Sequence, residues 1–99
     1  MTVTENKSGN SIELQVAGRL DTNTSPELET KLKQVASQCQ TLYLNLQNIE
    51  YISSAGLRTV LLAHKLMLPT GGKMILKSPS SFCRQVLEAT GMDGILTIE

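Results

Sequence analysis

The hydrophobic residues of this 99-residue chain change their spacing from one segment to the next, and this change constrains the fold most. Ile12, Leu14 and Val16 alternate with polar residues, and a period of two indicates a strand with one buried face. Leu28 and Leu32 then recur at the spacing of a helix. The same change of spacing is repeated along the rest of the chain, which predicts an α/β fold.

The predicted elements follow the order strand, strand, helix, strand, helix, strand, helix, strand. We place the strands from residue 3, at 11–16, 41–46, 73–77 and 95–98, and the helices from residue 25, at 55–68 and from residue 79 to a stop at Gly91. A hairpin followed by alternating units implies a mostly parallel sheet with one antiparallel strand at the N-terminus. The length fits a single domain, residues 1–99, with about three main helices packed largely on one face.

Two helices carry more detailed signals. Ser25 is expected to cap the first helix, directly before Pro26. A capping hydroxyl accepts a hydrogen bond from a free amide of the first turn, and proline needs no such partner there. In the third helix, the spacing places Phe82, Val86 and Ala89 on one face, and Cys83, within the same apolar pattern, is expected to be a small core residue.

Composition argues against several classes of function. Nine basic and nine acidic side chains cancel, and only three aromatic residues are present, so nothing indicates a nucleic-acid surface. The most apolar helical segment, residues 60–68, is far shorter than the roughly 20 residues that span a bilayer. The N-terminus shows no basic segment followed by an apolar run. We therefore expect a cytoplasmic protein without a membrane or nucleic-acid partner.

The cysteines and acidic residues lack the spacing of a redox or metal site. Cys39 and Cys83 are far apart and form no CxxC motif, so reduced thiols are expected, while a disulfide stays open on sequence grounds. Asp21, Glu50 and Asp93 show no metal-ligand spacing. Neither a metal nor a cofactor is expected.

Two segments, residues 18–26 and 48–58, each join the end of a predicted strand to the start of a helix. Ligands and partners of open parallel sheets usually bind at that edge. The four small residues at 53–56 leave the first amides of the second helix uncovered, and a phosphate on Ser54 would be stabilised there. Serine is also a common helix cap, so a purely structural role for Ser53 or Ser54 stays open.

A nucleophilic serine enzyme is a competing interpretation of Ser54. The GxSxG pattern is absent, because Ile52 stands where the first glycine would be. The only histidine, His64, lies two to three turns further along the same predicted helix, out of reach for a general base. Small serine hydrolase is therefore the least favoured function.

Several motifs together resemble one known family. They are Gly18-Arg19-Leu20-Asp21, Leu44-Asn45-Leu46, Ile52-Ser53-Ser54-Ala55-Gly56-Leu57, Gly71-Gly72-Lys73 and Thr90-Gly91-Met92. In this combination and at these spacings, nearly the whole chain resembles the STAS family, in particular the free-standing bacterial anti-sigma factor antagonists.

The family pattern around the phosphorylated serine is often Asp-Ser-Ser-Gly. By that match Ser54 stands at the phosphorylated serine, and Ser53 replaces the usual aspartate. Ser53 thereby becomes an alternative acceptor. Asp21 matches the family's loop aspartate near the partner surface.

The resemblance implies a partner switch. The unphosphorylated protein would bind an anti-sigma factor, or a related regulator, with a serine kinase fold. That kinase would phosphorylate Ser54 with its own ATP, phosphorylation would release the complex, and a PP2C-like phosphatase would reset it. The expected partner-binding residues are Asp21, Thr22, Asn23, Thr24, Ser53, Gly56, Leu57 and Arg58.

Three points stay open at this stage. Asp21 either faces the partner or is a loop aspartate that caps backbone amides. Arg58 either pairs with a partner carboxylate or is simply solvated. The family also allows a different role, a non-phosphorylated STAS scaffold or subunit of a transport system. The serine at position 54 favours the switch over the scaffold.

Overall fold

Strands and helices alternate along the chain, and the computed structural model describes every residue from Met1 to Glu99. The predicted order of strands and main helices is confirmed. The strands are β1 (Thr2–Ser8), β2 (Ser11–Leu20), β3 (Thr41–Ile52), β4 (Lys73–Lys77) and β5 (Thr97–Ile98). The helices are α1 (Ser25–Val35), α2 (Ser54–Met67) and α3 (Ser81–Thr90), with two short 3₁₀ helices at Ala36–Gln38 and Met92–Gly94.

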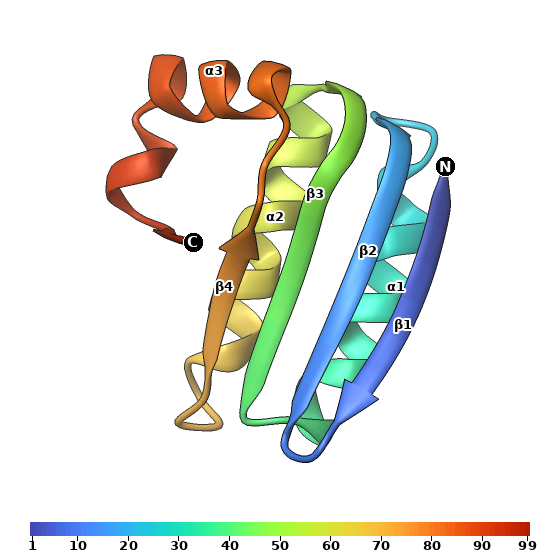
Figure 1. Ribbon diagram of the computed structural model, residues 1–99, viewed down its shortest axis with the longest axis vertical. Coiled ribbons are helices and arrows are strands. Elements are labelled where there is room, and N and C mark those ends of the chain that lie inside the picture. The colour runs from blue at the N-terminus through green and yellow to red at the C-terminus, as the bar shows by residue number, and fades with distance from the viewer.

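All strands belong to one five-stranded sheet with the spatial order β1-β2-β3-β4-β5. β1 is antiparallel to β2, and every later pair of neighbours is parallel (Figure 1). Parallel strands that advance in one direction, joined by right-handed crossovers, place their helices on the same face of the sheet. The predicted α/β class, with an N-terminal antiparallel strand, is confirmed.

The helices differ in how they meet the sheet. α1 and α2 lie next to each other behind it, whereas α3 lies across the carboxyl ends of the strands, against β3 (Figure 1). None of the three combines the length and the hydrophobicity that a membrane crossing would require. The carboxyl ends of β2 and β3 are therefore bordered by the starts of α1 and α2 and by α3.

A core of 22 buried residues fills the space between the sheet and the helices. Alternate residues of the central strands point into it, among them Leu14 and Leu44, each fully buried. Leu32 of α1 and Val60 of α2 meet them from the other side and are also fully buried. Each such side chain stabilises the fold by roughly 1.5–3 kcal/mol through loss of apolar surface from water.

The third strand is longer than the sequence indicates. Its apolar run ends at residue 46, where the prediction stops it, but β3 continues to Ile52. Pairing with β2 extends it, because the parallel ladder runs on to the pair Leu20–Ile52 after two irregularities in register. Hydrophobicity does not record a backbone ladder, so the polar residues between 47 and 51 concealed this extension.

The face that α3 buries was predicted only in part, since Cys83 lies in the core as expected but Phe82 and Ala89 do not. Cys83 and Leu87 are fully buried, whereas Phe82 and Ala89 are exposed. The helix starts at Ser81 after the capping Ser80, whose amide donates to the carbonyl of Leu46. This hydrogen bond ties the N-terminal end of α3 to β3. Burial raises the pKa of the Cys83 thiol to about 11, so this cysteine is an unreactive core residue.

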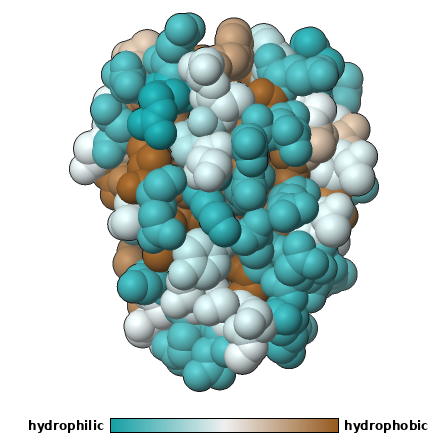
Figure 2. Space-filling model, in the orientation of Figure 1, coloured by the Kyte–Doolittle hydropathy of each residue, from teal (hydrophilic) through white to brown (hydrophobic).

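The other face of the sheet, turned away from α1 and α2, is mainly hydrophilic (Figure 2). Glu13 on β2 accepts a hydrogen bond from the Asn45 side chain at 3.2 Å and forms an ion pair with Lys77 at 3.1 Å. A hydrogen bond from Gln15 lowers the pKa of Glu13 against its desolvation, with help from Lys77 and Asn45. Polar side chains thus cover this face without a helix.

Candidate functional site

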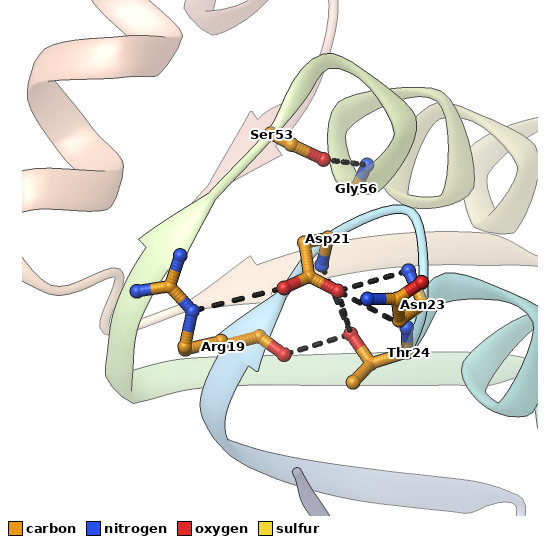
Figure 3. A network of polar contacts seen from close by, with 6 residues as sticks. All are labelled: Arg19, Asp21, Asn23, Thr24, Ser53 and Gly56. Carbon is orange, nitrogen blue, oxygen red and sulfur yellow. Dashed lines mark hydrogen bonds and ion pairs between the residues drawn. The ribbon is translucent and has the colours of Figure 1, made fainter.

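The two segments singled out in the sequence meet at the carboxyl ends of β2 and β3 (Figure 3). One is the loop between β2 and α1, residues 21–24, and the other is the start of α2. The Ser53 amide donates to the Leu20 carbonyl at 2.9 Å, which joins the two segments directly. They therefore form one continuous surface.

Gly56 makes this close approach sterically feasible. A Cβ atom at position 56 would lie 2.5 Å from the Leu20 carbonyl oxygen and 2.8 Å from Cγ1 of Ile52. No larger residue fits there without displacing backbone. Gly56 is buried, so it holds α2 against β2 and does not itself face a partner.

Asp21 organises the loop between β2 and α1 (Figure 3). Its Oδ1 accepts hydrogen bonds from the amides of Asn23 at 3.0 Å and Thr24 at 3.2 Å. The Thr24 hydroxyl accepts from the Asp21 amide at 2.9 Å and donates to the Arg19 carbonyl at 2.8 Å. An aspartate that bonds the amides following it is a common way to fix a turn, so both polar side chains are committed to the loop itself.

The charge of Asp21 is stabilised in place. Desolvation acts to raise the pKa of its carboxyl, but the hydrogen bonds from Thr24 and Asn23, together with the charge of Arg19, lower it below the ordinary value. The Arg19 Nε lies 3.7 Å from Oδ2 of Asp21. Asp21 is therefore ionised at neutral pH and presents a fixed negative charge at the edge of the site.

An arginine and two aromatic rings extend the site toward α3. The Arg19 guanidinium lies 4.3 Å from the centre of the Tyr51 ring, a cation–π contact. The Tyr51 ring lies 5.9 Å from that of Phe82, centre to centre. Arg19 and Tyr51 lie in the two segments singled out in the sequence but were not named as site residues, and Phe82 was assigned only to a helix face. The alternation of Leu20 and Ile52 with their neighbours was a further signal, since it turns Arg19 and Tyr51 to the same face of paired strands.

The two serines at the start of α2 have different roles. Ser53 is the N-cap, and its hydroxyl accepts from the Gly56 amide at 3.3 Å. Ser54 is the first helical residue, is exposed, and takes no part in the cap. The role of helix cap therefore belongs to Ser53, and the Ser54 hydroxyl is left free.

The capping prediction for α1 was wrong. Thr24, not Ser25, is the N-cap residue, and its side chain makes no capping hydrogen bond because it is engaged with Asp21 and Arg19. Ser25 is already inside the helix, and its amide donates to the Asp21 carbonyl at 2.8 Å. Its hydroxyl is buried and has no hydrogen-bond partner in the protein.

The remaining predicted partner residues lie on the surface around Ser54. Thr22, Asn23 and Arg58 are exposed, and Leu57 is partly buried against the core. Arg58 takes part in none of the ion pairs of the structure, and α2 contains no acidic residue. The start of α2 therefore carries the positive end of the helix dipole and the guanidinium of Arg58, which forms no ion pair.

Known proteins share this fold. The STAS domain family matches residues 2–99. The anti-sigma-B factor antagonist of Bacillus subtilis is 29% identical over 89 residues, which are 90% of this chain and 82% of that relative. Structures of the Bacillus protein SpoIIAA, unphosphorylated and phosphorylated, align with TM-scores of 0.84 and 0.77, both at 18% identity over 99% of this chain and over 88% and 91% of theirs. The match along nearly all of its length shows that this chain belongs to the STAS domain family.

Proposed function

We propose that this protein is an anti-sigma factor antagonist that works by partner switching, with Ser54 as its phosphorylation site. The names of the relatives support the general role. The assignment to Ser54 rests on one observation, the different roles of the two serines at the start of α2. Ser53 is committed to the cap, while Ser54 presents a free, exposed hydroxyl at the same helix terminus.

The chemistry of this position suits a phosphate. The amides of the first helical turn have no acceptor within the helix, and they lie at its positive end. A phosphate on Ser54 would bring roughly −1.5 to −2 charges to that end. Arg58 stands four residues further along, the spacing at which helical side chains meet. The modified serine is therefore accommodated without refolding.

Phosphorylation would act on the interface by charge and bulk. The unmodified surface combines the fixed loop of Asp21 with the uncharged hydroxyl of Ser54 and the half-buried Leu57. A phosphate in its middle repels acidic groups of a partner and cannot be desolvated cheaply. A swing from mostly bound to mostly free needs up to about 5.5 kcal/mol of differential affinity, which one unmatched phosphate can supply.

The partner in this proposal is an anti-sigma factor with a serine kinase fold, and a PP2C-like phosphatase removes the phosphate. The docking surface consists of Asp21, Thr22, Asn23, Thr24, Ser53, Leu57 and Arg58, with Gly56 as the support beneath it. The protein itself is a binding module and has no catalytic residue in this mechanism. The serine hydrolase alternative is not supported, since His64 stands ten residues beyond Ser54 on the same helix, about 15 Å along its axis.

The decisive experiment is phosphate transfer from the cognate kinase. Incubation with ATP should add one phosphate, and intact-mass and peptide mass spectrometry should place it on Ser54. Ser54→Ala should abolish the label, whereas Ser53→Ala, which removes the cap but keeps the acceptor, should retain it. Label that survives in Ser54→Ala and disappears in Ser53→Ala would move the site by one residue. No label on either serine would favour the non-phosphorylated scaffold.

A further inference from the structure

A recess of about 400 Å³ lies between the N-terminal halves of α1 and α2. Ser25 and Glu29 line it from α1, and Arg58 and Thr59 line it from α2. Two of its eight lining residues are hydrophobic, so it is mainly a polar recess. It borders the docking surface proposed above, because Arg58 and Thr22 belong to both.

Ser25 supplies the first indication of a ligand. The residue is only 6% exposed, and its hydroxyl makes no hydrogen bond in the protein. Its amide is already used by the Asp21 carbonyl. A buried hydroxyl without a partner destabilises a fold, and it is rarely retained without a reason. Ser25 is therefore a residue of the recess wall whose buried hydroxyl has no acceptor in the protein.

The charges around the recess favour a negatively charged acceptor. Arg58 has no ion-pair partner. Glu29, the one acidic lining residue, is paired with Lys33 at 3.2 Å, which offsets its charge. The Thr59 hydroxyl is occupied, since it donates to the Ala55 carbonyl at 3.1 Å. The adjoining N-terminus of α2 adds its positive end. The recess therefore has unpaired hydrogen-bond donors and a positive charge, while its one acidic side chain is already paired.

We infer that this recess is a carboxylate site, and that the partner fills it with the side chain of an aspartate or glutamate. The Arg58 guanidinium would bind the carboxylate, and the Ser25 hydroxyl would donate a second hydrogen bond. A guanidinium matches the planar, two-oxygen geometry of a carboxylate. Because Lys33 offsets Glu29, Arg58 leaves about one net positive charge at the recess, which a carboxylate balances and a phosphate dianion exceeds. This inference rests on the proposed function for the source of the carboxylate, but the recess itself can be tested without any partner.

The test uses unphosphorylated protein and a blocked amino acid, N-acetyl-glutamate amide, followed by amide chemical shifts in NMR. The probe should shift the signals of Ser25, Ala55 and Thr59 in a saturable way, whereas N-acetyl-glutamine amide, its neutral isostere, should not. Ser25→Ala should weaken binding about tenfold, the loss of one hydrogen bond to a charged group. The same variant should raise the thermal midpoint of the free protein, because it removes the unsatisfied hydroxyl.

Arg58→Gln should abolish the binding, and Lys65→Gln should leave it unchanged. Lys65 is a matched control, an exposed cation on the same helix that does not line the recess. Equal binding of the glutamine probe, equal loss in Lys65→Gln, or binding of inorganic phosphate without binding of the glutamate probe would each overturn the carboxylate site.

A second measurement tests the source of the carboxylate. An excess of the glutamate probe should lower the affinity of the cognate kinase in a calorimetric titration. Binding of the probe with unchanged kinase affinity would overturn the assignment to the partner. The probe experiments need neither kinase nor phosphate transfer, so their failure is distinct from a failure to label Ser54.

Discussion

The loop between β2 and α1 and the start of α2 lie side by side, but they use their polar groups in opposite ways. In the loop, the side chains of Asp21 and Thr24 form hydrogen bonds with backbone groups of residues 19–24. At the start of α2, Ser53 alone is committed, while Ser54 and Arg58 remain free and exposed. One segment is a rigid frame, and the other presents groups that can react or bind.

This difference explains how a switch can work without a change of fold. A partner needs a surface of fixed shape, which the hydrogen-bonded loop provides. A kinase needs an accessible hydroxyl, which the first residue of α2 provides. Because the Ser53 amide bonds the Leu20 carbonyl, a modification at Ser54 is directly next to the rigid part of the surface.

The largest effect is expected from a substitution that separates the two segments. Gly56→Ala would place a Cβ 2.5 Å from the Leu20 carbonyl oxygen, and the backbone would have to move. We expect a loss of about 3 kcal/mol in the free energy of unfolding, the upper end for overpacking, measured by urea denaturation. The matched control is Gly94→Ala, where nothing lies within 4 Å of the new Cβ. Equal stability of the two variants would contradict the close contact.

The second largest effect is expected at Ser54, at the start of α2. Ser54→Asp places a negative charge at an exposed position at the positive end of the helix dipole. We expect partner affinity in a calorimetric titration to fall about tenfold, or 1.4 kcal/mol. The thermal midpoint should stay nearly unchanged, since an acidic residue in the first turn is tolerated or slightly favourable. Unaltered partner affinity would show that charge at this position does not control binding.

A smaller effect should separate the two serines. Ser53→Ala removes the N-cap and should cost about 1 kcal/mol of stability. Ser54→Ala removes an exposed hydroxyl and should change stability by less than about 0.5 kcal/mol. Chemical denaturation of the two variants under one set of conditions measures the difference. A larger loss in Ser54→Ala would reverse the roles assigned to the two residues.

The smallest effect is a pH dependence of the loop. The pKa of Asp21 is lower in the folded protein than its ordinary value of 3.8. A lowered folded pKa means that the stabilisation is complete above the unfolded pKa and is lost as the pH falls through the folded one. Asp21→Asn should therefore flatten the stability profile between about pH 5 and pH 2 relative to the wild type. A profile as steep in Asp21→Asn as in the wild type would assign the acid sensitivity to other carboxylates, such as Glu13.

The sequence predicted those parts of the molecule that depend on local spacing. The alternation of Ile12 and Leu14 located β2, although the strand continues past the predicted residue 16 to Leu20. Gly91 does end α3, in the left-handed conformation that glycine adopts readily. The errors arose where tertiary contacts decide. The polar end of β3 is held by its ladder with β2, and α3 turns Cys83 and Leu87, not Phe82 and Ala89, toward the core.

The candidate site shows the same division. Its position at the ends of β2 and β3 could be read from the chain, since both segments follow strands. The roles of the Thr24 and Ser25 hydroxyls could not be predicted, because either residue can cap a helix. Only the folded loop shows that the Thr24 hydroxyl is bonded to Asp21 and that the Ser25 hydroxyl is buried. The recess between α1 and α2 has no sequence signature at all, because it depends on how two helices pack.

The sheet ends in two very different outer strands, and both limit self-association. β1 is exposed along nearly its whole length and carries Glu5 and Lys7, while β5 has only two residues. Charged and very short edges resist the addition of a strand from another molecule. Strand addition recruits a whole row of main-chain bonds and is slow to undo. A protein that exchanges partners therefore benefits from sheet edges that resist strand addition, because copies joined edge to edge would compete with partners for the protein.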